Sequence, residues 1–482
     1  MQELTGLIAG LNKREIKLVR WLYTSSGNSE EKLRLQIFDY ILKNKKAEEQ
    51  EIKIKISYRG SRSAFSHLKR RIRNDILNVI LLQESNKKFR APMFTASFEV
   101  KKKMAFAELL YRRGLLDLGD NLIDEGVKMA KNFELIAEQY ILTDFQRITQ
   151  GITKGNKIIG KANNEIEEIV EAISANSKVV NLFYDFTIRY LGKKSFSQEK
   201  LKEAQQSLIQ MENIYKKHPF ARIGFWYHRA AISYHSQNQE YEQAFLHGKL
   251  LLDLTENNQA LYTPVNLAGA SKDLAEICIS AKKFDLGARY SNRAMELFNP
   301  KLNNYLLTLE NLFQSEFYLG NLENCKNAYI KAKNHPRFNK SKSTKAKWNY
   351  FNSCILFKEN KFKECLDSLN NFKQEYLSDK GEMQFGYRLL ILINYIELKK
   401  YDIFEFELDS FRKSIYYYKD YYKERISSII KILNELQKND FDFSNFSKFK
   451  AENKITEKWQ PLGYEMIEFF EWLNKKTITD EN

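Results

Sequence analysis

Residues 274–298 read LAEICISAKKFDLGARYSNRAMELF, and residues 312–332 read LFQSEFYLGNLENCKNAYIKA. Each stretch predicts two helices joined by a tight turn, because apolar residues recur every three or four positions on both sides of a short polar break. The second helix begins at Phe284 in the first stretch and at Leu322 in the second. The two stretches therefore look like consecutive copies of one helical hairpin, and they decide the fold.

The first large apolar residue of the second helix is an anchor that recurs along the chain. The last five anchors lie 43, 38, 40 and 39 residues apart. A small residue three positions after the anchor lets the two helices of a hairpin approach closely. The anchors are Leu116, Tyr241, Phe284, Leu322, Phe362 and Tyr401, and the small residues are Gly119, Ala244, Gly287, Cys325 and Cys365. Tyr401 has Phe404 at this position, so hydrophobic periodicity alone supports that copy.

A fixed period near 40 residues is typical of a solenoid, in which each hairpin buries its apolar face against its neighbours. The gap of 125 residues between Leu116 and Tyr241 fits three such units. We therefore expect degenerate copies with turns near Lys157 and Glu199. The sequence predicts an all-α, right-handed α-solenoid over residues 104–440.

The pattern resembles tetratricopeptide repeats, with a Gly or polar turn, an aromatic start to the second helix and small residues at packing positions. Two short motifs, at 68–77 and 469–473, are loosely similar to uncharacterised helical repeat proteins of Bacteroidetes-type bacteria. The first resemblance implies a scaffold whose first helices line a groove, and neither implies an activity. Inward-facing candidates for peptide binding are Trp226, Arg229, Lys272, Glu276, Glu310, Gln314 and Tyr350, with Cys354 beside them.

The segments outside the solenoid are predicted from capping signals and composition. Residues 1–90 form a basic helical module, with a capping box at Asn12 and a further cap at Ser61. Its isoleucines at 52, 54 and 56 alternate with lysines, which suits a strand or an extended linker. Residues 91–103 are expected to be a linker, 441–458 a polar loop, and 459–482 a helix and tail that cap the last repeat, in preference to a tethered helix that docks a partner.

Composition limits the classes of function. The 482 residues carry a net charge of +16 and only four cysteines, without metal-ligand spacing. We expect the cysteines to be small core residues in a reducing compartment, most simply the cytoplasm. No apolar run is long enough to insert into a membrane, and no secretion signal opens the chain.

Positive charge is concentrated near the N-terminus. Residues 51–103 hold 14 Lys or Arg against four acids, so +10 of the net +16 falls there. The side chains of Arg62, Lys69, Arg70 and Arg73 are predicted to lie away from the apolar stripe of their helix. They form either a solvated helix face or a surface that neutralises nucleic-acid phosphates.

The sequence offers no complete catalytic, metal or cofactor motif. Residues 155–162 fit the first part of a phosphate-binding loop, but Ala162 replaces the hydroxyl that would hold magnesium and no strand precedes them. His228 and His235 share a helix face without a visible third metal ligand. We therefore expect a non-enzymatic scaffold or adaptor that binds a protein or peptide. The alternative is a regulatory protein whose basic module binds nucleic acid and whose solenoid is a sensor.

Overall fold

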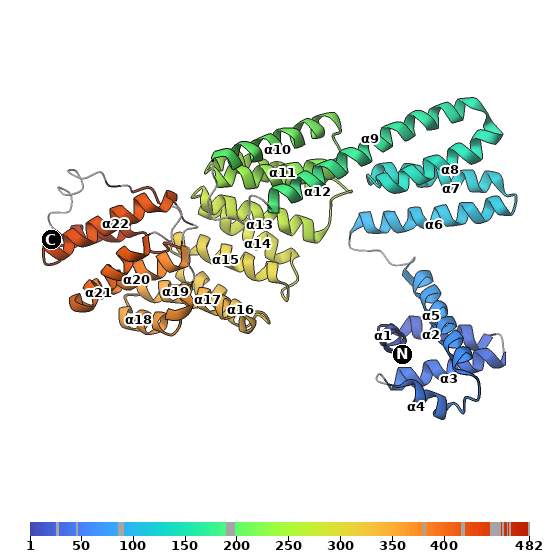
Figure 1. Ribbon diagram of the computed structural model, residues 1–482, viewed down its shortest axis with the longest axis horizontal. Coiled ribbons are helices and arrows are strands. Elements are labelled where there is room, and N and C mark those ends of the chain that lie inside the picture. The colour runs from blue at the N-terminus through green and yellow to red at the C-terminus, as the bar shows by residue number, and fades with distance from the viewer. Residues whose placement is uncertain are drawn as a thin grey trace. The chain divides into compact units, whose positions relative to one another are not determined.

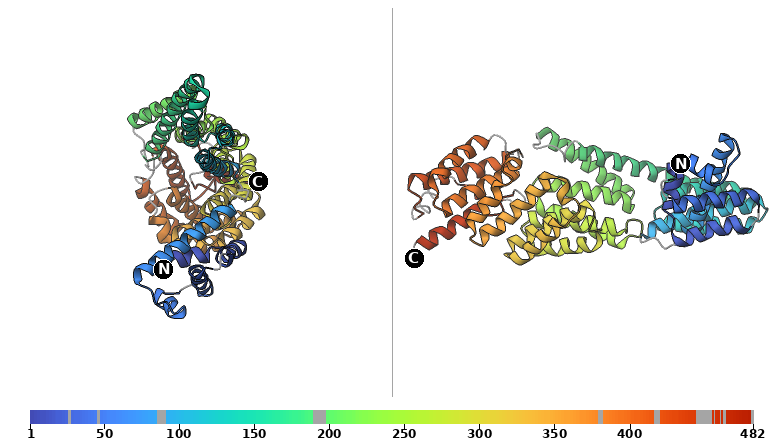
Figure 2. Two further views of the ribbon diagram at one scale, coloured as in Figure 1. Left: turned by 90° about the vertical axis from the view of Figure 1, so that its right-hand side faces the viewer. Right: turned by 90° about the horizontal axis from the view of Figure 1, so that it is seen from below.

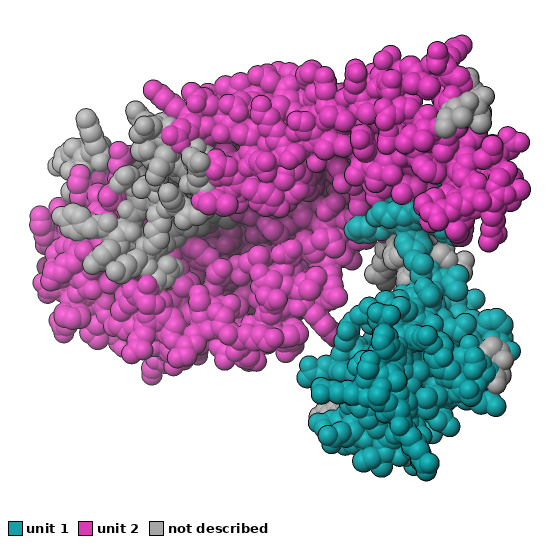
Figure 3. Space-filling view, turned by 45° about the vertical axis from the view of Figure 1, so that its right-hand side comes forward, with its two compact units in different colours: residues 1–89, 94–103 teal, residues 90–93, 104–482 magenta. Residues whose placement is uncertain are grey.

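The computed structural model describes the chain except for residues 26–27, 45–46, 85–90, 189–197, 379–381, 416–419, 444–454, 456, 460, 462–463 and 481–482. The part that is described is built from α-helices, and no strand occurs in it. The all-α prediction is thus confirmed for these residues. The chain divides into two compact units, residues 1–89 with 94–103, and residues 90–93 with 104–482 (Figure 3).

The first unit is a helical module with its own core. Its described residues form α1 (Gln2–Ala9), α2 (Lys13–Ser25), α3 (Ser29–Lys43), α4 (Glu49–Lys55) and α5 (Arg62–Glu84), together with residues 94–103 of the following helix. The predicted capping box is present, because Glu15 N–H donates to the Asn12 side chain at 3.0 Å and Asn12 N–H donates to the Glu15 carboxylate at 2.8 Å. Ser61 accepts from the N–H of Ala64 at 3.1 Å, which confirms the other cap.

The strand or linker predicted around Ile54 is wrong, because these residues form helix α4. Ile52 is fully buried and Ile56 packs against the same core, whereas Ile54 is 79% exposed. Residues four apart share a helix face, so the buried pair follows the helical period and not the strand period. Two carboxylates fix the helix start, since Glu48 and Glu51 form a capping box. The alternating pattern therefore reflects lysines on a short amphipathic helix.

The second unit begins with α6 (Pro92–Arg112), whose residues 94–103 are grouped with the first unit. The predicted linker at 91–103 is therefore mostly helical. Pro92 lies at the start of α6, where a missing N–H removes no helical hydrogen bond. The next helices are α7 (Leu116–Asn132), α8 (Ile136–Lys154), α9 (Asn156–Phe186), α10 (Gln198–Lys217), α11 (Ala221–Gln237), α12 (Tyr241–Asn257), α13 (Pro264–Ser280) and α14 (Phe284–Leu297).

The remaining helices continue the same order, and consecutive helices pack on one another (Figure 1). The right-hand view in Figure 2 shows the colours of the second unit following the chain from α10 to α24. These helices are α15 (Asn303–Tyr318), α16 (Leu322–Lys333), α17 (Lys342–Lys358), α18 (Phe362–Asn370), α19 (Lys373–Ser378), α20 (Glu382–Glu397), α21 (Tyr401–Ser414), α22 (Asp420–Lys438) and α24 (Phe469–Asp480), with a 3₁₀ turn at Phe338–Lys340. The second unit is thus repeat-like, with adjacent helices packed as in a solenoid.

All six predicted anchors are the first residues of their helices, namely of α7, α12, α14, α16, α18 and α21. The same turn precedes each of them. At α14, the N–H of Lys283 donates to the carbonyl of Cys278 at 2.7 Å, and Lys282 between them has φ 59°. This is a Schellman turn, which ends one helix with a left-handed residue and satisfies its last carbonyls. The left-handed residues are Gly114, Gln239, Lys282, Gly320, Asn360 and Lys399.

Residues 127–225 follow the predicted spacing only in part. An additional Schellman turn with its left-handed residue at Glu134 joins α7 to α8. The turn predicted near Lys157 occurs at Gly155, with φ 83°, but it opens the 31-residue helix α9. Glu199 lies in the first turn of α10, and residues 189–197 before it lie outside the described part. The turn at Glu134 falls between those at Gly114 and Gly155, so the predicted spacing does not include it.

Small residues let the hairpins pack closely, as predicted. A Cβ on Gly287 would lie 2.6 Å from the Ser315 side chain on the next hairpin. Cys325 and Cys365, the equivalents of Gly287, are fully buried, and all four cysteines are free thiols. Burial raises the pKa of Cys325 and of Cys365 to about 12. These thiols are therefore packing residues, which confirms that prediction.

Two glycines allow the turn to be tested. A methyl group added at Gly320 or at Gly269 would meet no atom within 4 Å, but only Gly320 has a left-handed φ, of 80°. Gly320→Ala should lower the free energy of unfolding by about 1 kcal/mol because an L-residue is strained there. Gly269→Ala, inside α13, should raise it by about 1 kcal/mol because alanine favours a helix. Chemical denaturation followed by circular dichroism measures both, and the same sign for both changes would contradict the turn's role.

Candidate functional site

The predicted groove residues lie on the first helices of consecutive hairpins, α11, α13, α15 and α17. Trp226 packs on Phe183, with ring centroids 4.8 Å apart. One turn further along α11, the guanidinium of Arg229 lies 3.6 Å from the carboxylate of Asp273 on α13. These contacts place an aromatic and a cationic side chain together at one end of the row.

Lys272 continues the row on α13. Its ammonium lies 3.0 Å from Asp273 and 3.3 Å from Glu276. Burial alone would lower the pKa of Lys272, but the two carboxylates outweigh burial and raise it. Lys272 is therefore charged at neutral pH. Glu276 is half exposed, so one carboxylate of this group faces solvent.

Glu310 and Lys347 extend the row to α15 and α17. They form an ion pair of 3.0 Å, in which the Glu310 side chain is 12% exposed. Burial raises the pKa of Glu310, and the cation of Lys347 opposes that effect. Charges of both signs therefore follow one another across four first helices. The ordered row is Arg229, Asp273, Lys272, Glu276, Glu310 and Lys347.

The other predicted groove residues are buried. Gln314 is 6% exposed, and among the described residues its side-chain oxygen has no hydrogen-bond partner. Tyr350 is 1% exposed, and its hydroxyl donates to the carbonyl of Tyr464 at 2.5 Å. Cys354 is fully buried. The structure thus brings five of the seven candidates to a partly open row and places Gln314 and Tyr350 beneath it.

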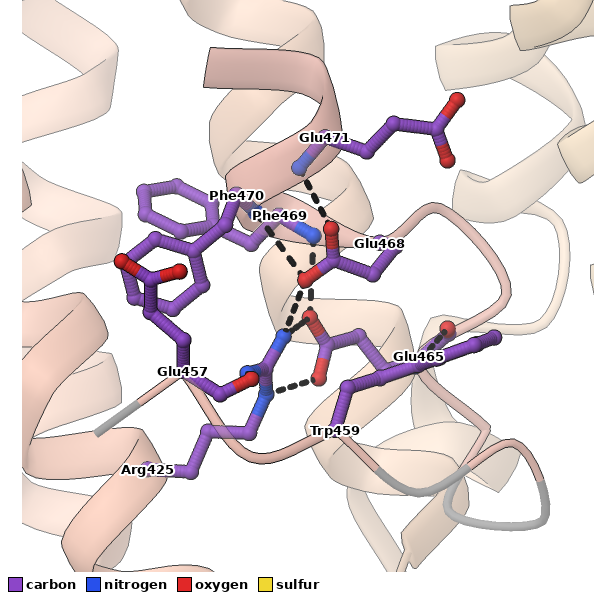
Figure 4. Close-up of polar contacts among 8 residues, drawn as sticks. All are labelled: Arg425, Glu457, Trp459, Glu465, Glu468, Phe469, Phe470 and Glu471. Carbon is purple, nitrogen blue, oxygen red and sulfur yellow. Dashed lines mark hydrogen bonds and ion pairs between the residues drawn. The ribbon is translucent and has the colours of Figure 1, made fainter. Parts of the chain in front are cut away.

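Tyr350 is covered by residues of the stretch 457–459, 461 and 464–476, which we call the C-terminal segment. Arg425 on α22 holds this segment through its buried guanidinium, which is 3% exposed (Figure 4). Two nitrogens of Arg425 donate to the Glu465 carboxylate at 2.6 Å, and a third hydrogen bond of 2.5 Å reaches Glu468. Arg425 also donates to the carbonyl of Glu457 at 2.7 Å.

The same two glutamates cap the N-terminus of helix α24. Glu465 accepts from the N–H of Phe469 at 2.9 Å, and Glu468 accepts from the N–H groups of Phe470 and Glu471 (Figure 4). Carboxylates at a helix N-terminus satisfy free N–H groups and complement the helix dipole. Burial raises the pKa of Glu465, while Arg425 opposes that rise. Arg425 and the helix start are therefore coupled through shared carboxylates.

The C-terminal segment contacts four first helices, α15, α17, α20 and α22, and not the last hairpin alone. The Tyr318 hydroxyl donates to the carbonyl of Pro461 at 2.7 Å. The Trp472 indole donates to Glu397 at 2.7 Å. The ring of Trp459 packs edge-on against Tyr318 at 5.0 Å, and its N–H donates to the carbonyl of Glu465 at 3.1 Å. Most of the predicted polar loop at 441–458 lies outside the described residues.

Three histidines meet between α11 and α12. The Nδ1 atoms of His228 and His247 are 3.0 Å apart, and the rings of His235 and His247 stack at 5.4 Å. His247 is the third histidine that the sequence did not reveal, because it lies on the partner helix. No group of three metal-ligating side chains in the described part of the chain is arranged to hold a metal ion.

In the first unit, two of the four predicted basic residues already have acidic partners. Lys69 pairs with Glu49 at 2.5 Å, and Arg73 pairs with Glu3 at 3.1 Å. Arg62 and Arg70 are exposed on α5, and no ion pair of theirs occurs among the described residues. The basic face of α5 is therefore partly neutralised.

The residues of the incomplete phosphate-loop motif lie in helical structure. Gly155 is the turn before α9, and Gly160 and Lys161 lie inside α9. Lys161 lines a cleft of about 420 Å³ together with Lys131, Glu134, Glu165 and Glu168. Acidic side chains predominate there, and Lys131 pairs with Glu165 at 2.7 Å. The arrangement lacks the glycine-rich loop between strand and helix that cradles phosphates.

A scan against models of known protein families finds no match, and no curated protein matches the sequence at a significant level. Within the described residues, no helix is long and apolar enough to cross a membrane. The site must therefore be interpreted from its own chemistry.

The histidine cluster predicts that the second unit loses stability in acid. Burial, then the neighbouring histidine in each case, lowers the pKa of His228 and of His247 from 6.5 to about 4. Other groups that face them are Tyr215, Tyr227 and Glu212. As pH falls from about 6.5 to about 4, the unfolded chain binds protons that the folded chain does not, so stability falls.

The double variant His228→Phe and His247→Phe removes both titrating rings without leaving one unpaired. Its thermal unfolding midpoint should fall less between pH 7 and pH 4.5 than that of the wild type. Circular dichroism at several pH values measures the difference. Parallel curves for the two proteins would show that the cluster does not control acid stability.

Proposed function

We propose that this chain is a non-enzymatic protein-interaction scaffold that binds a peptide or protein along the first helices of its second unit. The proposal depends on the row of charges of both signs from Arg229 to Lys347 across α11, α13, α15 and α17. Paired, partly open charges of both signs complement a polar peptide and fix its register more than they add affinity.

The hairpin architecture supports this proposal. A solenoid presents an extended surface because each repeat contributes side chains at a regular spacing. We propose a tetratricopeptide-like, right-handed superhelix in the cytoplasm, with the C-terminal segment covering the later repeats. Trp226 would supply an aromatic contact at the end of the row, next to Arg229. Aromatic and arginine side chains are the groups that dominate most protein interfaces.

The alternative is a regulator whose first unit binds nucleic acid. The exposed Arg62 and Arg70 on α5 favour it, since they lack ion pairs within the described residues. Lys69 and Arg73 favour it less, because each already has a carboxylate partner. Displacing those carboxylates would reduce the gain from each phosphate contact.

Affinity purification of the tagged chain from its native host, with and without nuclease, tests the first proposal. The variant Arg229→Glu with Glu276→Lys inverts two exposed charges of the row without changing net charge. We expect it to reduce the recovered partner at least tenfold, which corresponds to about 1.4 kcal/mol. The matched control is Asp285→Lys with Arg289→Glu, which inverts an exposed ion pair on α14. The control should recover the partner as the wild type does.

Two outcomes would contradict the proposal that the charged row binds a peptide. Equal losses in the two charge-inverted variants would show that the row has no special role. Nucleic acid that co-purifies, and is lost with nuclease or in the variant Arg62→Glu with Arg70→Glu, would favour the alternative.

A further inference from the structure

The C-terminal segment is held by its backbone as much as by its side chains. The hydroxyls of Tyr318 and Tyr350 donate to the carbonyls of Pro461 and Tyr464. A Cβ on Gly386 of α20 would collide with the carbonyl of Tyr464, so glycine makes room for the passing backbone. Hydrogen bonds to carbonyls and a glycine at the closest approach are how proteins bind an extended peptide.

Charge complementarity accompanies these backbone contacts. Arg425 faces Glu465 and Glu468, and Lys347 lies 6.0 Å from the ring centre of Tyr464. Lys282 lies 5.2 Å from the ring centre of Trp459, and Lys476 pairs with Glu397 at 2.6 Å. Arg425, Lys347 and Lys282 thus meet carboxylates or aromatic rings of the segment, whereas Glu397 of α20 meets the segment's own Lys476.

Arg425 is the residue on which specificity depends. Its side chain is 3% exposed and Glu465 is 2% exposed, so neither charge has access to water to replace a lost partner. An unpaired buried charge is strongly unfavourable. A segment without the two glutamates would leave Arg425 unpaired and would be rejected. A segment with them also gains its helix N-cap.

We propose that the surface formed by Tyr318, Tyr350, Gly386 and Arg425 is a peptide-binding site, and that the C-terminal segment is its internal ligand. The partner that it fits is a protein segment with aromatic residues followed by two glutamates three positions apart at a helix start. The partner segment competes with the internal one for Arg425. This inference deepens the proposed scaffold function, on which it rests, by naming the chemistry of a partner.

Competition in trans tests the inference on the full chain. Glu465→Gln with Glu468→Gln removes both charges that pair with Arg425, so we expect the internal segment to release. Hydrogen exchange of residues 464–476 should then be at least tenfold faster than in the wild type. The matched control is Glu471→Gln, which removes an exposed glutamate paired with Lys475 and should not change the exchange.

A fluorescent peptide of the natural sequence 457–482 is then added to each protein. We expect the double-glutamine variant to bind it, the wild type to bind it at least tenfold more weakly, and a further Arg425→Leu change to abolish binding. Continued protection of the internal segment would overturn the inference, as would a folded, released variant that does not bind the peptide. Binding that persists with Arg425→Leu would also overturn it.

Size-exclusion chromatography with light scattering tests whether the C-terminal segment of a second copy of the chain occupies the surface. A monomer agrees with an internal ligand, whereas a dimer that exchanges its C-terminal segments would show that a second copy occupies the surface. The double-glutamine variant changes no residue of the row from Arg229 to Lys347, although Lys347 also contacts Tyr464. Failure of the peptide experiment would therefore not contradict the row, which the charge inversion at Arg229 and Glu276 tests. The two proposals can therefore fail separately.

Discussion

The second unit depends on one hydrogen bond that recurs, from an N–H after a left-handed residue to a carbonyl five positions earlier. This bond ends one helix and starts the next within three residues. Because the turn geometry is fixed, the second helix returns along the first, and small residues let the two approach: a Cβ on Gly287 would lie 3.2 Å from the Ile279 side chain of the first helix. Repetition of the turn places successive first helices side by side, and those helices carry the candidate site.

Much of this arrangement could be predicted from sequence, since the anchors Phe284 and Leu322 begin their helices as expected. The signal came from an apolar residue after a polar break. That signal does not predict the turn at Glu134, because this turn falls between those at Gly114 and Gly155 and outside the predicted spacing. The isoleucines around Ile54 misled because lysines between them imitate a strand. Apolar periodicity therefore predicts the turns that recur at the repeat spacing, whether the left-handed residue is Gly320 or Lys282, and misses a turn that falls between them.

The candidate site likewise contains residues that the sequence predicts and contacts that it does not. Counting from the anchors located Arg229, Lys272 and Glu276 on one row, because helix periodicity determines which side chains share a face. It could not reveal that Glu310 pairs with Lys347, 37 residues away, or that Arg425 pairs with Glu465, 40 residues away. Helix periodicity does not indicate which residues on different helices form ion pairs. The contacts of the C-terminal segment depend on tertiary packing, which propensity and spacing do not encode.

The C-terminal segment lies on α15, α17 and α20 of its own chain. Lys476 and Glu397 are 2.6 Å apart, close enough for a carbodiimide to join them without a spacer. Crosslinking of the full chain at low concentration, followed by mass spectrometry of the monomer, should find this bond in the wild type and lose it in Glu397→Gln. A monomer that lacks the Lys476–Glu397 crosslink, or a crosslink found only in dimers, would contradict the account.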